Sequence, residues 1–218
     1  MKSLLAAAIL CLLSSLLSTT VIARQSADSM YLSIVGRVKA GDTTVDCQGL
    51  RFAYAATSQY DPFTIPPEED SIQDALRQKK YRRVLELAEE ILDRNYVYIP
   101  AHSACARAYR GMGDSIRSAF HEGIAERLLV SIANSGDGKS LGSGYKIIHV
   151  QEQYALLLSL GYWPTKHEEI ESEIPYEIVT AEHESTGKEA KFYFDISIPI
   201  EWAMRKYDES EGSGLERR

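Results

Sequence analysis

The chain has 218 residues and an acidic balance, with 24 Lys and Arg residues against 31 Asp and Glu residues and a formal net charge of −7 at pH 7. Nucleic-acid phosphates require a basic face on a protein, so this balance argues against a nucleic-acid partner. The length is sufficient for one sizeable core or two small ones.

The N-terminal residues predict a secretory signal peptide. Lys2 supplies a positive charge, residues 4–17 form a nearly continuous apolar run, and residues 21–23 (Val-Ile-Ala) suit signal peptidase. Because the apolar run is short for a membrane span, we expect cleavage after Ala23, which makes 1–23 the leader. An uncleaved anchor is the alternative. We therefore expect an exported protein, periplasmic or secreted, with no transmembrane segment after cleavage.

Cleavage would leave two cysteines, Cys47 and Cys105. In an oxidising compartment such a pair can form a disulfide. Cys105, however, lies among Ala101, Ala104 and Ala108, which is typical of a close-packed helix face where a free thiol acts as a small apolar group. We favour two separate thiols, with a disulfide as the alternative.

Residues 24–133 predict an array of helices, from apolar periodicity and from the glycines and prolines that end the periodic stretches. The expected helices cover residues 26–39, 47–58, 69–78, 81–94, 100–109 and 115–129. Prolines at 62, 66 and 67 predict an extended linker before the third of them.

The middle of this array contains a degenerate repeat. Tyr81, Val84, Leu85 and Ala88 recur 35 residues later as Ile116, Ala119, Phe120 and Gly123. This period is typical of tetratricopeptide-type helical hairpins, although the usual Trp and Leu-Gly positions are missing. We predict antiparallel hairpins of this type, and unrelated antiparallel helices of similar length are the alternative.

The pattern changes after a glycine- and serine-rich loop at 134–144. Strands are predicted at 145–150, 176–182 and 190–198, with a helix at 151–160. The acidic run at 167–173 predicts a solvated connector, and a surface that docks a basic partner is the alternative. We therefore predict an α+β fold in which residues 134–207 form a small three-stranded antiparallel sheet region packed on the helices. The charged end, 208–218, predicts disorder.

Several short motifs resemble chemical sites without completing them. Gly138-Lys139-Ser140 matches the end of a phosphate-binding loop, but Ala133 stands where the motif requires its first glycine. The loop offers one carboxylate, Asp137, which is too few for calcium. His149 and Glu152 have the spacing of metal ligands on a helix but straddle a predicted strand end and helix start. We expect no catalytic residue, no metal site and no cofactor.

Four segments occur in an order found in an uncharacterised protein family. They are Gly-Asp-Thr-Thr at 41–44, Tyr-Asp-Pro-Phe at 60–63, Ser-Gly-Asp-Gly-Lys-Ser at 135–140 and Phe-Tyr-Phe-Asp-Ile-Ser at 192–197. With this combination the chain resembles a domain-of-unknown-function family of exported Gram-negative bacterial proteins. Two departures are the short segment before Gly41 and Asp61, where asparagine is commoner. The resemblance implies a signal peptide, a helical middle and a β-containing end, but no activity.

The sequence favours a non-enzymatic protein–protein interaction module of the cell envelope, whose partner is another envelope or secreted protein. Stacked helical hairpins form a concave face that binds peptides or partner helices. Tyr96, Tyr98 and Tyr109 suit such a face, because tyrosine is enriched at interfaces.

The alternative is an envelope hydrolase or small-ligand binder at the junction of the 134–144 loop and the sheet. Asp137, Lys139, His149 and Asp195 are the candidate ligand-binding residues there. A deep polar pocket holding two of them would favour this alternative, whereas an exposed apolar groove along the helices would favour the interaction module.

Overall fold

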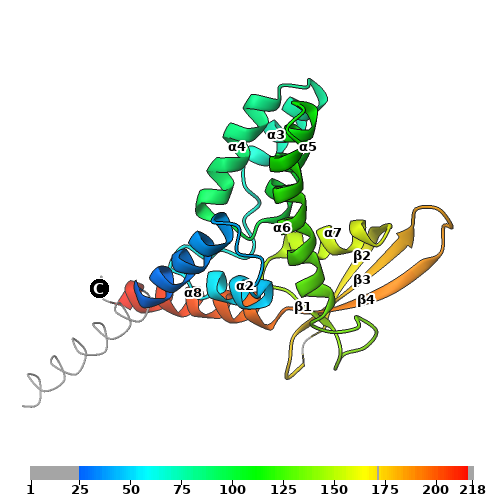
Figure 1. Cartoon of the computed structure of the whole chain (residues 1–218). Coiled ribbons are helices and arrows are strands. Elements are labelled where there is room, and N and C mark those ends of the chain that lie inside the picture. The colour runs from blue at the N-terminus through cyan, green and yellow to red at the C-terminus, as the bar shows by residue number, and fades with distance from the viewer. Residues whose placement is uncertain (1–24, 171, 216–218) are drawn as a thin grey trace, which may run out of the picture. The chain divides into compact units, whose positions relative to one another are not determined.

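The structure is a computed structural model that describes residues 25–170 and 172–215 (Figure 1). The chain divides into two compact units, Met1–Tyr60 and Asp61–Arg218. The predicted signal peptide, residues 1–23, lies outside the described residues. Within the described residues, no helix combines the length and the apolar character that crossing a membrane requires.

The described part of the first unit is a helical hairpin. A helix at 25–39 is followed by a turn at Gly41, whose φ of +88° favours glycine, and then by α2 (Cys47–Ala55). Asp46 caps α2, because its carboxylate accepts hydrogen bonds from backbone N–H groups of the first turn. The rings of Tyr31 and Tyr54 pack in its core, 5.5 Å apart between centroids.

Consecutive antiparallel helices open the second unit. They are α3 (Glu68–Arg77), α4 (Tyr81–Arg94), α5 (Ile99–Gly111) and α6 (Ser115–Ala133). Fully buried side chains such as Val84, Ala88 and Leu128 form their common core. Tyr81 packs its ring against Gly111, where a Cβ atom would overlap the ring. The predicted helical hairpins are present; their tetratricopeptide type stays a prediction.

The sheet confirms the α+β class but corrects the predicted sheet. Its strands are β1 (Tyr145–Lys146), β2 (Tyr162–Ile170), β3 (Tyr176–His183) and β4 (Glu189–Asp195), in the order β1-β4-β3-β2. Because β1 pairs with β4 in parallel and the other pairs are antiparallel, the sheet is mixed and four-stranded, not antiparallel and three-stranded. Most of the expected acidic connector belongs to the edge strand β2, whose register shifts between Pro164 and Lys166. A bulge of this kind accommodates proline at a sheet edge.

Two further helices complete the second unit. α7 (Val150–Ser159) covers one face of the sheet, where the Gln153 side-chain amide donates a hydrogen bond to Glu177 at 2.6 Å. α8 (Ser197–Leu215) follows β4 directly. This helix includes residues 208–215, for which the sequence predicts disorder, so that prediction is wrong for this part of the segment.

Candidate functional site

Asp137 closes the glycine-rich loop in which it lies. Its Oδ1 accepts hydrogen bonds from the backbone N–H of Lys139 at 3.0 Å and from the Ser143 hydroxyl at 2.5 Å. The Ser143 hydrogen bond is the main cause of the lowered pKa of the Asp137 carboxyl. Gly138 has a φ of +66°, and the ring of Tyr145 occupies the space beside its Cα. The Lys139 side chain is exposed. The loop therefore uses Asp137 to hold its own backbone.

Asp195 is buried at the start of α8, where it serves as a cap. Its Oδ1 accepts a hydrogen bond from the backbone N–H of Ser197 at 2.9 Å, and its Oδ2 lies 3.4 Å from Lys146 Nζ. Lys146 stands opposite Asp195 in the β1–β4 register. Asp195 thus joins β4, β1 and α8.

His149 interacts with a different set of residues. Its Nδ1 accepts a hydrogen bond from the backbone N–H of Gln151 at 3.1 Å, so the ring proton is on Nε2, which donates to the Thr64 carbonyl at 3.3 Å. Burial lowers the pKa of His149, although the carboxylates of Glu152 and Asp61 oppose this shift. His149 is therefore a neutral helix cap.

The cavity beside His149 is very small. Its volume of about 10 Å³ is enough for one water molecule, and its lining includes Tyr98, His149 and Glu152. The Glu152 carboxylate accepts a hydrogen bond from the backbone N–H of Ile148 at 2.8 Å. This is not the deep polar pocket that a hydrolase or ligand binder requires.

The tyrosines predicted to bind a partner lie in the core. Tyr96, Tyr98 and Tyr109 are 3%, 3% and 6% exposed. Tyr98 donates a hydrogen bond to Glu69 at 2.6 Å, and burial together with that bond raises its pKa. Tyr96 packs edge-on against His102, and burial raises the pKa of Tyr96 to about 12. A surface for a partner must therefore come from other residues.

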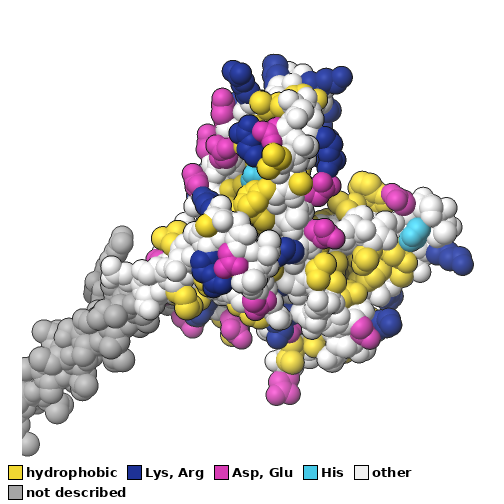
Figure 2. Space-filling model, viewed as in Figure 1, with side chains coloured by type: hydrophobic (Ala, Val, Ile, Leu, Met, Phe, Trp, Pro, Cys, Tyr) yellow, Lys and Arg dark blue, Asp and Glu magenta, His cyan; other side chains and the backbone are white. Residues whose placement is uncertain are grey.

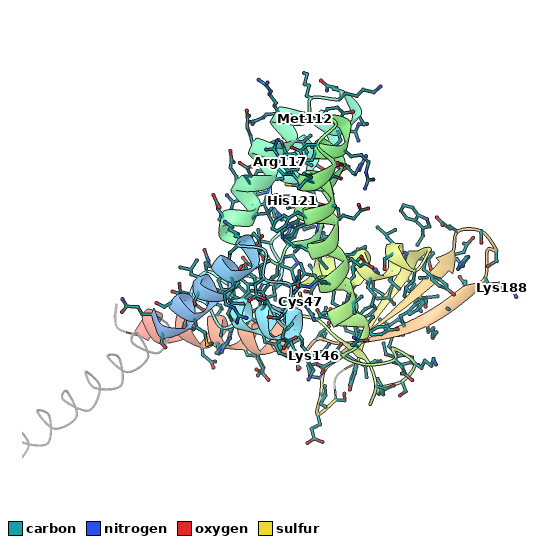
Figure 3. The ribbon with its side chains drawn as sticks, in the orientation of Figure 1. Cys47, Met112, Arg117, His121, Lys146 and Lys188 are labelled. Atoms are coloured by element: carbon teal, nitrogen blue, oxygen red, sulfur yellow. The ribbon has the colours of Figure 1, made fainter. Side chains whose placement is uncertain are left out.

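Two histidines that the sequence did not single out join α5 to α6. The Nδ1 atoms of His102 and His121 are 3.1 Å apart, and His102 Nε2 lies 2.7 Å from the Tyr96 carbonyl. A carbonyl only accepts, so His102 Nε2 donates to it and His102 Nδ1 accepts from His121. Tyr109 stacks on His121, and the Arg117 guanidinium lies over the Tyr109 ring at 4.5 Å. Figure 3 shows Arg117 and His121 on α6. Burial lowers the pKa of His121.

Metal and thiol chemistry gain no support from the described residues. Within them, no three His, Cys, Asp or Glu side chains gather as a metal site would need. Cys47 and Cys105 are both buried and are not joined in a disulfide, which agrees with two separate thiols. Burial raises the pKa of Cys105 to about 12, so its thiol is unreactive.

An open groove lies between α5 and α6, with a volume of about 370 Å³. Its lining residues fall at i, i+3, i+4 and i+7 on each helix, so one face of each helix forms one wall. They are Ser103, Ala106, Arg107 and Arg110 from α5, and Glu122, Ala125, Glu126 and Leu129 from α6. Ala106 and Ala125 are 5% and 7% exposed and form a narrow apolar floor.

The two helices contribute side chains of opposite charge to the groove. The α5 wall carries Arg107 and Arg110, and the α6 wall carries Glu122 and Glu126. Figure 2 shows basic and acidic side chains together along this pair of helices. Arg110 and Glu122 form an ion pair at 2.7 Å, but their side chains are 60% and 58% exposed. Such a pair contributes about 0–1 kcal/mol, so a partner can displace it at little cost.

Comparison with known proteins identifies the family of this chain but assigns it no function. The chain belongs to the family DUF4919, described as a domain of unknown function, whose family model matches residues 19–205. This confirms the resemblance to an uncharacterised family. No curated protein and no solved structure matches the chain.

Proposed function

We propose that this protein is a non-enzymatic protein-binding module of the cell envelope and that the groove between α5 and α6 is its binding surface. The observation that carries the proposal is the groove itself, about 370 Å³ in volume, with alanines on its floor and charged residues on its walls. An apolar surface rimmed by charged residues is typical of interaction sites.

The shape of the groove suits a helical segment of a partner. Two neighbouring helices form a furrow between them, and small side chains on its floor allow a third helix to approach to the usual 8–10 Å between axes. Ala106 and Ala125 occupy that floor. Helix-in-groove binding of this kind uses anchors at helical spacing, which is also the spacing of the wall residues.

The alternative site at the loop–sheet junction has weaker support. The carboxylates of Asp137 and Asp195 already accept hydrogen bonds from backbone N–H groups. The imidazole of His149 caps α7. These groups are occupied in maintaining the fold, and the adjoining cavity of about 10 Å³ admits no substrate.

Site-specific photo-crosslinking tests the proposal. A photo-reactive amino acid replaces Arg107 in the full chain, and a matched probe replaces Glu90, which is exposed on α4 outside the groove. We expect one discrete protein adduct from position 107 and none from position 90. Ser103→Trp, a change at an exposed position that fills the groove, should abolish the adduct. Equal products from both probes, or an adduct insensitive to Ser103→Trp, would refute the proposed surface.

A further inference from the structure

The groove contains two charged side chains that have no ion-pair partner within residues 25–170 and 172–215. Arg110 and Glu122 pair across the groove. Among the described residues, however, Arg107 and Glu126 each lack an ion-pair partner, although both line the groove. A segment lying in the groove would therefore meet one unpaired cation on the α5 side and one unpaired anion on the α6 side.

Each wall also places like charges on neighbouring turns of its helix. Arg107 and Arg110 are separated by i, i+3, and Glu122 and Glu126 by i, i+4. Like charges at these spacings repel each other, and a counter-charge between them relieves the repulsion. The α5 wall consequently favours acidic side chains and the α6 wall favours basic ones.

The length of the groove sets how much of a partner it can hold. The α5 wall extends from Ser103 to Arg110 and the α6 wall from Glu122 to Leu129. Seven residues of helix rise about 10 Å, or about two turns, so the contact covers about two turns of a docked helix. Over that length, an apolar stripe on the partner faces Ala106 and Ala125, and its two flanks face the two walls.

We propose that the natural occupant of the groove is an amphipathic helix of another protein that carries acidic residues on one flank of its apolar stripe and basic residues on the other. This inference rests on the proposed function, because it names the partner of the same groove. A helix turned end for end exchanges its flanks, so the charge pattern of a given helix fixes the direction in which it docks.

Three synthetic helical peptides of equal length and identical apolar stripe test the inference. One has an acidic and a basic flank, one has two acidic flanks, and one has two basic flanks. Fluorescence anisotropy with the full chain measures their binding at low and at physiological salt. We expect the mixed peptide to bind at least about tenfold more tightly than the others, with a smaller difference at higher salt.

Charge reversal in the protein provides the decisive control. The double variant Arg107→Glu and Arg110→Glu makes both walls acidic, so the peptide with two basic flanks should become the tightest ligand. The matched variant Arg82→Glu and Arg83→Glu changes exposed arginines of α4 outside the groove, and it should leave the ranking unchanged. Far-UV circular dichroism confirms that both variants are folded.

The outcomes separate this inference from the proposed function. Equal binding of the three peptides, no binding of any, or a ranking unaffected by Arg107→Glu and Arg110→Glu would overturn the mixed-charge partner. If the crosslink from position 107 nevertheless persists and Ser103→Trp abolishes it, the groove remains the binding surface. Loss of both results would overturn both statements.

Discussion

Protonation of His149 should destabilise the unit Asp61–Arg218. The imidazole is 4% exposed, and its Nδ1 accepts the hydrogen bond that caps α7. A proton on Nδ1 would remove this cap and place a charge in the core, so burial holds the pKa below its usual value of 6.5. In the unfolded chain the same group titrates near 6.5. At pH values between the pKa of His149 in the folded state and its pKa in the unfolded state, the unfolded state binds more protons than the folded state. The free energy of unfolding therefore falls as the pH falls below about 6.5.

The magnitude is bounded by the one proton that His149 takes up. One proton corresponds to a slope of at most about 1.4 kcal/mol per pH unit. Burial also lowers the pKa of His121, which contributes with the same sign in the same window. Carboxyl groups with a lowered pKa, such as Asp61, stabilise the folded state at higher pH and lose this stabilisation only below about pH 5. The window from pH 6.5 to 5.0 therefore reports on the histidines.

His149→Asn isolates the contribution of this residue. Asparagine is a good N-cap, so the cap of α7 survives, while the titration and the hydrogen bond to Thr64 are lost. We expect a loss of about 1 kcal/mol at pH 7.5 and a slope between pH 6.5 and 5.0 that is shallower by up to about 1.4 kcal/mol per pH unit. Urea unfolding followed by Trp fluorescence is suitable, because Trp163 and Trp202 both lie in this unit. Parallel pH profiles for the wild type and the variant would refute the reasoning.

Further substitutions test the packing of the helices. Gly111→Ala places a methyl group into the ring of Tyr81 and should cost about 1–3 kcal/mol in urea unfolding, a loss that Tyr81→Ala in the same chain would partly relieve. Tyr98→Phe leaves Glu69 without its 2.6 Å hydrogen bond and should cost about 1.5–3 kcal/mol in the same assay; an unchanged midpoint would mean that water replaces the hydroxyl. Cys105, with a pKa of about 12, should resist iodoacetamide at pH 8 until urea unfolds the chain, and labelling of the folded protein would contradict its burial.

The helices were predictable because their apolar periods are continuous. Residues 81–94 were predicted as one helix, and α4 has the same bounds. The sheet was less predictable. A strand of two residues, such as β1, is too short to show a period, and its parallel pairing depends on β4, far away in the chain. Most residues of the edge strand β2 are exposed, and Lys166, Glu168 and Glu169 are charged, so the strand has the composition of a connector.

The groove could not be predicted from the sequence because each of its residues is ordinary on its own. Arg107 and Glu126 are typical of a solvated helix face, and Ala106 is typical of a packed one. Only the pairing of α5 with α6 places them in one furrow. The tyrosines illustrate the opposite case. Tyr96 and Tyr98 suited a half-exposed surface, but neighbouring side chains bury both of them.

The four segments that carry the family resemblance share one structural device. Each contains an aspartate whose Oδ1 accepts a hydrogen bond from the backbone N–H two residues later. The aspartates are Asp42, Asp61, Asp137 and Asp195. This is the Asx-turn arrangement, which an asparagine oxygen makes equally well. An Asp61→Asn substitution should therefore leave the turn intact.

The most recognisable motifs of this chain consequently mark turns. Each of these carboxylates holds a backbone N–H with its Oδ1, so the turn depends on it. A surface for recognition instead requires side chains that the fold does not use. Arg107 and Glu126 meet this requirement, because both line the groove and neither has an ion-pair partner among the described residues. The proposed binding surface thus lies in the part of the sequence that is least distinctive.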